Sequence, residues 1–263
     1  MRVIMRNFSA FFLVYIKQQK VHKANVWGKF IYIPIQSLAI CIIWYVISLY
    51  NNNVSYVHMV SYYVVCAIMS SAFPYARHTR DVQEDIFSGV FSAYEVIPGG
   101  YLLSRLSFFY SWLMIYSIVA LPSLFTLICL CNDYESSLFV FINSALFFFL
   151  GAIVTFLQWA IVADLSFWTQ KILGLVKVYY TVIAFFSGSL VPYIVLPNRF
   201  KLLFDILPFK YSAYFPARIV TEGLTTTECI PDVFILIMYI AVFSLIHCWV
   251  FSEGRRHYDG GFH

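Results

Sequence analysis

The residues best suited to polar chemistry are concentrated in one short stretch of an otherwise apolar chain, residues 75–98. This stretch holds six of the 13 acidic and basic residues that precede position 131. Asp81 and Glu84 have the spacing of a capping box, in which side chains satisfy the first free backbone groups of a helix. With Asp85 they place three carboxylates where the helix dipole favours negative charge. The stretch therefore predicts a short helix that begins near Asp81.

This helix is better suited to binding another protein than to catalysis. Val82, Ile86 and Val90 recur every four residues and form one apolar stripe. Gly89 lies on the same side and permits close approach of a partner backbone. The candidate docking residues are Val82, Glu84, Asp85, Ile86, Gly89 and Val90. We expect this stretch to form an amphipathic docking helix on the cytoplasmic side; the alternative is a solvated charged loop without a partner.

The elements that position this helix lie within a membrane. Hydrophobic residues make up 61% of the chain and charged residues 11%, a balance that excludes an ordinary soluble domain. The apolar residues occur in runs of about 20, long enough to cross a bilayer as helix. The sequence predicts an all-α integral membrane protein with six transmembrane helices. The predicted spans are 28–50, 56–74, 102–131, 138–163, 172–192 and 231–252.

The distribution of Lys and Arg sets the expected orientation. With the N-terminus inside, 13 of the 17 basic residues lie at the cytoplasmic side. The other four lie in one long outer segment: Arg199, Lys201, Lys210 and Arg218. We therefore expect a multi-pass protein of the cell (plasma or inner) membrane with both termini cytoplasmic. The net charge of +4 then reflects membrane topology and gives no support to nucleic-acid binding.

Residues 2–27 predict an amphipathic helix at the lipid headgroups, because apolar residues follow helical spacing and lysines cluster near its end. A simple basic anchor for the first span is an equal alternative.

Two predicted spans carry stripes of small or polar residues. Such stripes indicate either helix packing or a substrate-lining face. The candidate pathway-lining residues are Thr155, Gln158, Lys177, Thr181 and Gly188. Lys177 lies about two turns inside the fifth span, where it lines a pathway or extends to the cytoplasmic surface. Asp164 lies at the inner end of the fourth span and is a candidate partner of Lys171 or Lys177.

The sequence predicts no catalytic residues and no metal site. Cys129 and Cys131 have the wrong spacing for zinc, and the six histidines, among them His247, show no ligand spacing. His247 is expected to be a packed, hydrogen-bonded side chain.

Residues 185–223 form an outer segment that is too apolar for a solvated loop and too rich in proline for a span. Such a segment dips partway into the membrane against protein, because unpaired backbone cannot face lipid. Its pattern is Phe186-Ser187-Gly188, then Pro192, Pro197, Leu207-Pro208-Phe209, Pro216 and Gly223. In the charged stretch, Asp85-Ile86, Gly89 and Pro98 follow in order.

In these motifs the chain resembles the permease subunits of type-2 (ABC-2) ATP-binding-cassette exporters, closest to the group that exports drugs and antimicrobial peptides. The resemblance extends over nearly the whole chain. Two positions depart from the family pattern: Ile97 stands where a basic residue often precedes the proline, and Glu95 adds a charge.

The resemblance implies one transmembrane domain over residues 1–263. Its parts would be a connecting helix (1–27), spans one and two (28–74), a coupling loop (75–98), spans three to five (99–192), an outer re-entrant segment (193–230), and span six with a cytoplasmic tail (231–263). Pro192, Pro197, Pro208 and Phe209 would form the outer gate.

It also implies partners: two copies of a cytoplasmic ATPase, a second permease in a homodimer or heterodimer, and membrane lipid. ATP and Mg²⁺ would bind the ATPase, which agrees with the lack of a G-x-x-x-x-G-K-[ST] phosphate loop in this sequence. The substrate would be amphiphilic or lipid-like (a drug, peptide antibiotic or pigment).

Three alternatives remain at this point. One is an exporter of glycans or lipid-linked polysaccharides. The second is a membrane-embedded lipid-modifying enzyme, which would need clustered His, Asp or Glu near one membrane face. The third is an ion channel or ion-coupled carrier, which would need inverted repeats or several intramembrane charges.

Overall fold

The computed structural model describes residues 2–21, 23–50, 55–97, 99–131, 134–169, 171–193, 196–197, 201 and 204–261. Within these ranges the chain is helical and contains no strand. The α-helices are α1 Arg2–Val21, α2 Lys23–Tyr50, α3 Tyr56–Ser70, α4 Tyr75–Phe87, α5 Val90–Glu95, α6 Gly100–Cys131, α7 Tyr134–Asp164, α8 Leu173–Phe186, α10 Tyr214–Glu222 and α11 Thr226–Gly261. Two 3₁₀ helices, η1 Leu165–Phe167 and η3 Pro208–Ser212, lie between them.

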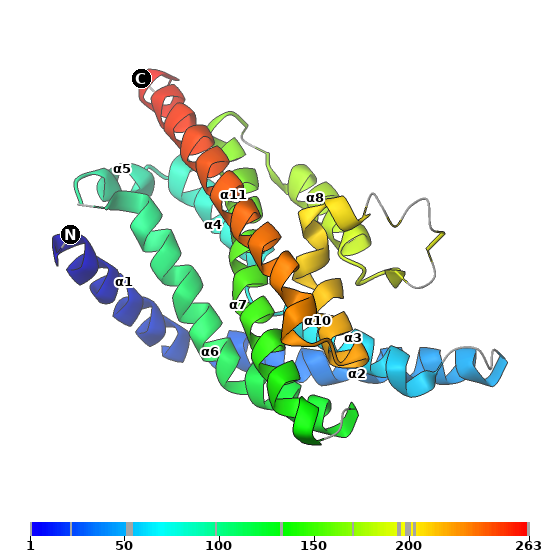
Figure 1. The fold of residues 1–263 in the computed structure, drawn as a ribbon. Helices are drawn as coiled ribbons and strands as arrows, with labels where there is room; N and C mark the ends of the chain where they lie inside the picture. Colours follow the sequence, from blue (N-terminus) through cyan, green and yellow to red (C-terminus); the bar gives the residue numbers. More distant parts are fainter. Residues whose placement is uncertain are drawn as a thin grey trace.

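Helix α7 is the element on which most others pack. It contacts α4, α6, α10 and α11, and Figure 1 shows the long α11 crossing the body beside it. Its side chains Phe147, Phe148 and Phe156 are buried. Its exposed side chains, such as Phe139 and Ile142, are also apolar, as expected of a membrane helix that meets lipid where it does not meet protein.

The N-terminal helix packs along α6 (Figure 1). Tyr15 hydrogen-bonds Ser104 at 2.6 Å, and the buried Gln19 side-chain nitrogen donates to Ser111 Oγ at 2.8 Å. The amphipathic pattern thus corresponds to a helix held against protein, while Leu13 and Val14 remain exposed on its other side. The expected connecting helix, residues 1–27, is divided between α1 and the start of α2.

Among the described residues, four apolar helical segments are long enough to cross a membrane: Tyr56–Phe87 (α3 together with α4), Gly100–Leu130, Ser137–Phe167 and Thr226–Tyr258. Helix α2 has 28 residues and contains the whole expected span 28–50, whereas α8, in the expected span 172–192, is shorter. Helix α8 has 14 residues, about 21 Å at ~1.5 Å per residue, less than the ~30 Å of hydrocarbon. The expected span 172–192 therefore ends early, at Ser187-Gly188, where Gly188 adopts a φ of 80°.

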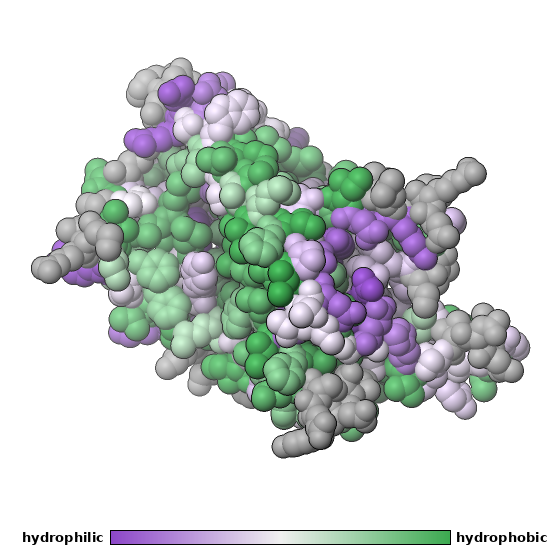
Figure 2. All heavy atoms as spheres, in the orientation of Figure 1, coloured by the Kyte–Doolittle hydropathy of each residue, from purple (hydrophilic) through white to green (hydrophobic). Residues whose placement is uncertain are grey.

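Hydrophobic side chains cover most of the surface in Figure 2, as expected for a protein in lipid. Hydrophilic side chains gather at the end of α11 and in a patch beside α10. The chain is a membrane protein by the length and composition of its helices.

The charged stretch forms two helices, α4 and α5, in place of the single helix predicted from Asp81. Helix α4 already begins at Tyr75, after Pro74, so Asp81 lies inside it and pairs with Arg77 at 3.9 Å. The capping role predicted for Asp81 was wrong. Gly89 adopts a left-handed φ of 75° and separates α4 from α5.

The segment after α8 folds back onto the body, as its proline-rich, apolar sequence predicted. Helix α10 packs on α3 and α7, and η3 packs on α7. Gly151 of α7 permits the closest approach: a Cβ there would lie 2.5 Å from the Tyr211 carbonyl oxygen. The backbone of η3 therefore lies where a side chain at position 151 would be.

We predict that Gly151→Ala lowers stability by about 1–3 kcal/mol, because the added methyl overlaps backbone that cannot move independently. The matched control is Gly174→Ala in α8, where a Cβ meets nothing within 4 Å. The control gains up to about 1 kcal/mol from higher helix propensity. Thermal unfolding of the detergent-solubilised variants measures both, and equal stability of the two would show that η3 does not pack at Gly151.

Candidate functional site

A cavity of ligand size lies between the α3–α4 junction, α7, α8 and η3. We call it the central cavity. Its volume is 380 Å³, within the about 300–1,000 Å³ typical of small-molecule sites. Its lining includes Ser70, Ser71, Phe73, Tyr75, Arg77, Phe147, Phe148, Gly151, Thr155, Trp159, Tyr180, Ala184, Ser187, Ser189, Tyr211 and Ser212.

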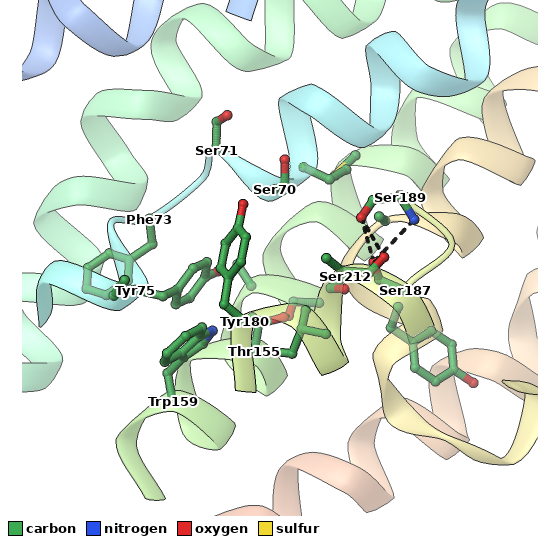
Figure 3. Close-up of a pocket in the computed structure, with 18 of the residues that line it drawn as sticks. Ser70, Ser71, Phe73, Tyr75, Thr155, Trp159, Tyr180, Ser187, Ser189 and Ser212 are labelled. Atoms are coloured by element: carbon green, nitrogen blue, oxygen red, sulfur yellow. Dashed lines mark hydrogen bonds between the residues drawn. The ribbon is translucent and has the colours of Figure 1, made fainter. Parts of the chain in front are cut away.

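One side of the central cavity is aromatic. The rings of Tyr75 and Trp159 stack with centroids 6.2 Å apart and an interplanar angle of 15°. Phe73 and Tyr180 lie on the same side (Figure 3). Tyr75 and Trp159 are 84 positions apart in the sequence, so this wall exists only when α4 packs on α7. Such a surface suits the apolar part of an amphiphilic molecule.

The opposite side carries hydroxyl groups. Ser187 and Ser189 hydrogen-bond each other at 3.0 Å, and Ser212 lies beside them (Figure 3). Ser212 and Thr155 donate to backbone carbonyls of their own helices, at 2.7 and 2.8 Å. Each hydroxyl oxygen retains lone pairs that can accept a hydrogen bond. The central cavity thus combines an apolar wall with a polar one, as an amphiphile requires.

The structure places some of the predicted pathway residues at this cavity and others elsewhere. Thr155 lines it. Gln158 is buried about one helical turn after Thr155 in α7, and its side chain accepts a hydrogen bond from Tyr179 at 3.2 Å. Lys177 and Thr181 are exposed on another face of α8. Ala184, which lines the cavity from α8, belongs to the small-residue stripe of the predicted fifth span, whereas the cavity-lining Tyr180 was not predicted.

Gly188 is buried at the outer end of the central cavity and shapes its boundary. Its carbonyl accepts a hydrogen bond from Tyr62 at 2.8 Å. A Cβ at this position would lie 2.7 Å from the Tyr62 hydroxyl and 3.1 Å from the Tyr193 ring. The role of Gly188 is therefore close packing with tyrosines.

The predicted outer-gate residues are spread over the segment that follows α8. Pro192 is buried and lines a second, outer cavity, whereas Pro197 is exposed. Pro208 begins η3, and the Phe209 ring contacts those of Tyr179 and Phe186 with centroids 6.4 and 6.1 Å away. Their role as a gate remains a prediction.

The cytoplasmic helices differ from the expected docking surface. Val82 and Ile86 are buried in a cluster with Phe91, Tyr101 and Phe167 of the same chain, so they do not form a partner-facing stripe. The stripe faces α7 and η1, on which α4 packs, and meets Ala163 and Phe167 there.

The other docking candidates divide between the interior and the surface. Asp85 forms an ion pair with Arg105 and accepts a hydrogen bond from Tyr101 at 2.9 Å. Glu84, Gly89 and Val90 are exposed, with Val90 at 44%. The accessible surface of this region therefore consists of the side of α4 that carries Glu84 and the junction between α4 and α5 at Gly89 and Val90.

A family model described as ABC-2 family transporter protein matches residues 130–261, half of the chain. The chain belongs to the ABC-2 transporter family. The matched part contains α7, α8, η3, α10 and α11, and thus most of the central cavity. Comparison with curated proteins and with solved structures found no match.

Members of the ABC-2 family are membrane components of transporters that generally work with a separate ATPase subunit. In this ABC-2 chain, the described residues include no group of three or more His, Cys, Asp or Glu placed to hold a metal ion.

Two polar pairs inside the ABC-2 chain were not predicted from the sequence. Asp164 pairs with His247 of α11 at 2.7 Å, so its predicted pairing with Lys171 or Lys177 was wrong. The expectation that His247 is packed and hydrogen-bonded is confirmed. The histidine lies 83 positions away, beyond the reach of local sequence patterns.

The second pair supports the wall of the central cavity. Lys210 of η3 lies 3.1 Å from Asp232 of α11, and the Tyr211 hydroxyl donates to the same carboxylate at 2.6 Å. Burial, together with this carboxylate, raises the pKa of the Tyr211 phenol, which therefore stays protonated as a donor. The Lys210 ammonium also lies 4.9 Å from the centre of the Tyr211 ring.

We predict that Asp232→Asn destabilises the protein by about 3–5 kcal/mol, because it leaves the Lys210 ammonium buried without a counter-charge. The control Glu253→Gln removes the exposed pair with Arg256 and changes stability by less than about 1 kcal/mol. Thermal unfolding compares the two. An additional Lys210→Met exchange in the Asp232→Asn background should restore part of the loss, and a loss that it does not reduce contradicts this account.

Proposed function

We propose that this chain is the permease subunit of an ATP-driven exporter, in which the central cavity holds an amphiphilic or lipid-like substrate on its way outward. The proposal rests chiefly on the composition of that cavity: an aromatic wall of Phe73, Tyr75 and Trp159 faces hydroxyl groups at Ser187 and Ser212. Membership of the ABC-2 family supports the same function.

The energy source is a separate cytoplasmic ATPase, since the sequence lacks a phosphate loop. This ATPase docks on the exposed side of α4 and α5, which carries Glu84, Gly89 and Val90. Phe87 and Val96, exposed apolar residues beside them, extend this surface. Two ATPases and a second permease complete the transporter.

The buried side of the same two helices packs on the membrane helices, and it therefore links the docked ATPase to them. Ile86 and Phe91 are buried against Tyr101 of α6 and Phe167 of η1. Asp85 adds its ion pair with Arg105 of α6. A movement of the docked ATPase is therefore transmitted to α6, α7 and α11 through packed side chains and charge pairs.

Contacts of α5 with both terminal helices support the proposed topology. The Phe11 ring of α1 lies 6.1 Å from that of Tyr94, and Ser92 hydrogen-bonds Tyr258 of α11 at 3.2 Å. The two terminal helices therefore reach the same end of the molecule as the docking helices. With six membrane crossings, in which α8 supplies a short passage, this end is cytoplasmic.

We predict that Val90→Asp prevents docking without unfolding the permease, because this exposed side chain gains a charge at the proposed interface. The ATP-binding subunit that co-purifies with the wild-type chain should be lost, while yield and thermal stability stay unchanged. Ile86→Asp, by contrast, buries an unpaired charge at a site that is 2% exposed and should unfold the cytoplasmic end. Undiminished ATPase binding by Val90→Asp, or no co-purifying ATPase with wild type, contradicts the proposed docking.

We also predict that the rate of substrate transport is at least about tenfold lower in Ala184→Trp than in Val178→Trp. Ala184 lines the central cavity, which an indole would fill, whereas Val178 is exposed on another face of α8. Both variants add the same side chain to the same helix. Transport of an amphiphilic dye into vesicles that contain the permease and its ATPase measures the difference. Equal transport by the two variants would place the substrate elsewhere.

A further inference from the structure

A second cavity of ligand size opens at the outer side, between α3, α10 and the segment that follows α8. We call it the outer cavity; its volume is 310 Å³. Unlike the central cavity it is strongly polar. Its charged and titratable lining residues are His58, Lys201, Asp205, Arg218 and Glu222. It coincides with the region of α10, beside which Figure 2 shows a hydrophilic patch on a mainly hydrophobic face.

Tyrosines close the outer cavity off from the central cavity. The rings of Tyr193 and Tyr214 stack at a centroid distance of 3.7 Å. Tyr193 donates to the carbonyl of Phe186 at 3.2 Å, and Tyr62 donates to that of Gly188. The Tyr214 backbone N–H also bonds the Ser187 carbonyl at 3.0 Å. In this conformation, a ligand of the outer cavity therefore enters from outside.

Most polar groups around the outer cavity are already satisfied. The hydroxyls of Tyr62 and Tyr193 donate to backbone carbonyls, as described above, and Thr221 donates to the Ala217 carbonyl at 3.0 Å. Arg218 Nε donates to Glu222 at 2.7 Å, so these two charges compensate each other. The groups that can still meet a ligand include the Lys201 ammonium, the Asp205 carboxylate and the half-buried His58 ring.

The remaining charges are Lys201 and Asp205. Among the described residues, neither forms an ion pair within 4.0 Å, although they lie only four positions apart. Asp205 lies close enough to the partition that, after burial, its charge is the next cause that raises the pKa of Tyr193. One cation and one anion thus line the same cavity, each with room for an external counter-charge.

We propose that the outer cavity is a binding site for a zwitterionic group, one that carries an ammonium together with a phosphate or carboxylate. The anionic end of the ligand pairs with Lys201 and its ammonium with Asp205. The tyrosine rings form apolar walls beside the carbon atoms between the two charges. Such a group occurs in phospholipid headgroups of the outer leaflet and in free zwitterions such as peptides. The site stands on its own geometry and does not depend on the substrate proposed for the central cavity.

The test uses the full chain in nanodiscs of phosphatidylglycerol, an anionic lipid without an ammonium, with O-phosphoethanolamine as the soluble probe. Calorimetric titration should show saturable binding. Inorganic phosphate and ethanolamine, which each carry one of the two charges, should bind at least about tenfold more weakly, because each lacks one charge-assisted contact. Absence of saturable binding, or equal affinity for phosphate alone, overturns the proposal.

Variants test the two charges separately. Lys201→Met and Asp205→Asn should each weaken O-phosphoethanolamine binding about tenfold or more. Lys171→Met, which removes an exposed lysine at the opposite end of the molecule, is the matched control and should bind as wild type. The double variant Lys201→Asp, Asp205→Lys should recover binding, because the probe can reverse its orientation. A merely structural role of the two residues predicts no such recovery, and its failure in a folded double variant overturns the proposal.

A final comparison distinguishes the two sources of the zwitterion. Replacing part of the phosphatidylglycerol with phosphatidylethanolamine should reduce the apparent affinity of the soluble probe if the natural occupant is a lipid headgroup. An unchanged titration identifies a free zwitterion as the ligand.

Discussion

In a body this apolar, a carboxylate or ammonium that leaves water is stable only when an opposite charge or a hydrogen-bond donor meets it. The structure has few such groups inside, and each joins elements that are distant in the sequence. Asp85 ties α4 to α6, Asp164 ties α7 to α11, and Asp232 ties α11 to η3. These pairs set which helix faces meet, whereas apolar contacts between similar helices and lipid discriminate poorly.

The same constraint is consistent with the two purposes that we propose for α4 and α5. With Asp85 held by Arg105 and Ile86 buried beside it, the inward face of α4 is fixed to the membrane helices. The opposite face remains accessible at Glu84 and Val90. A short helix attached rigidly on one side and free on the other is a suitable lever, because force applied to the free side reaches several spans together.

The outer segment divides the space within the body. Lys210, held by Asp232, seats η3 on α7 at Gly151, and Tyr193 and Tyr214 separate the central cavity from the outer one. The two cavities have different lining: aromatic rings and hydroxyl groups inside, charges outside. Opening of the tyrosine partition would connect them, and its hydrogen bonds are to backbone carbonyls that change partners when the segment moves.

The sequence by itself determined the helical membrane class, the amphipathic first helix, the charged stretch as a separate element and the folded-back outer segment. These features follow from composition and from local periodicity, which one chain segment carries alone. Only the tertiary structure decided that Ile86 faces inward, that Asp164 pairs with His247, and that Tyr75 and Trp159 share a cavity wall. Each of these depends on the rotation of one helix against another. Rotation is fixed by packing and charge pairing between residues about 80 positions apart, and no local pattern records it.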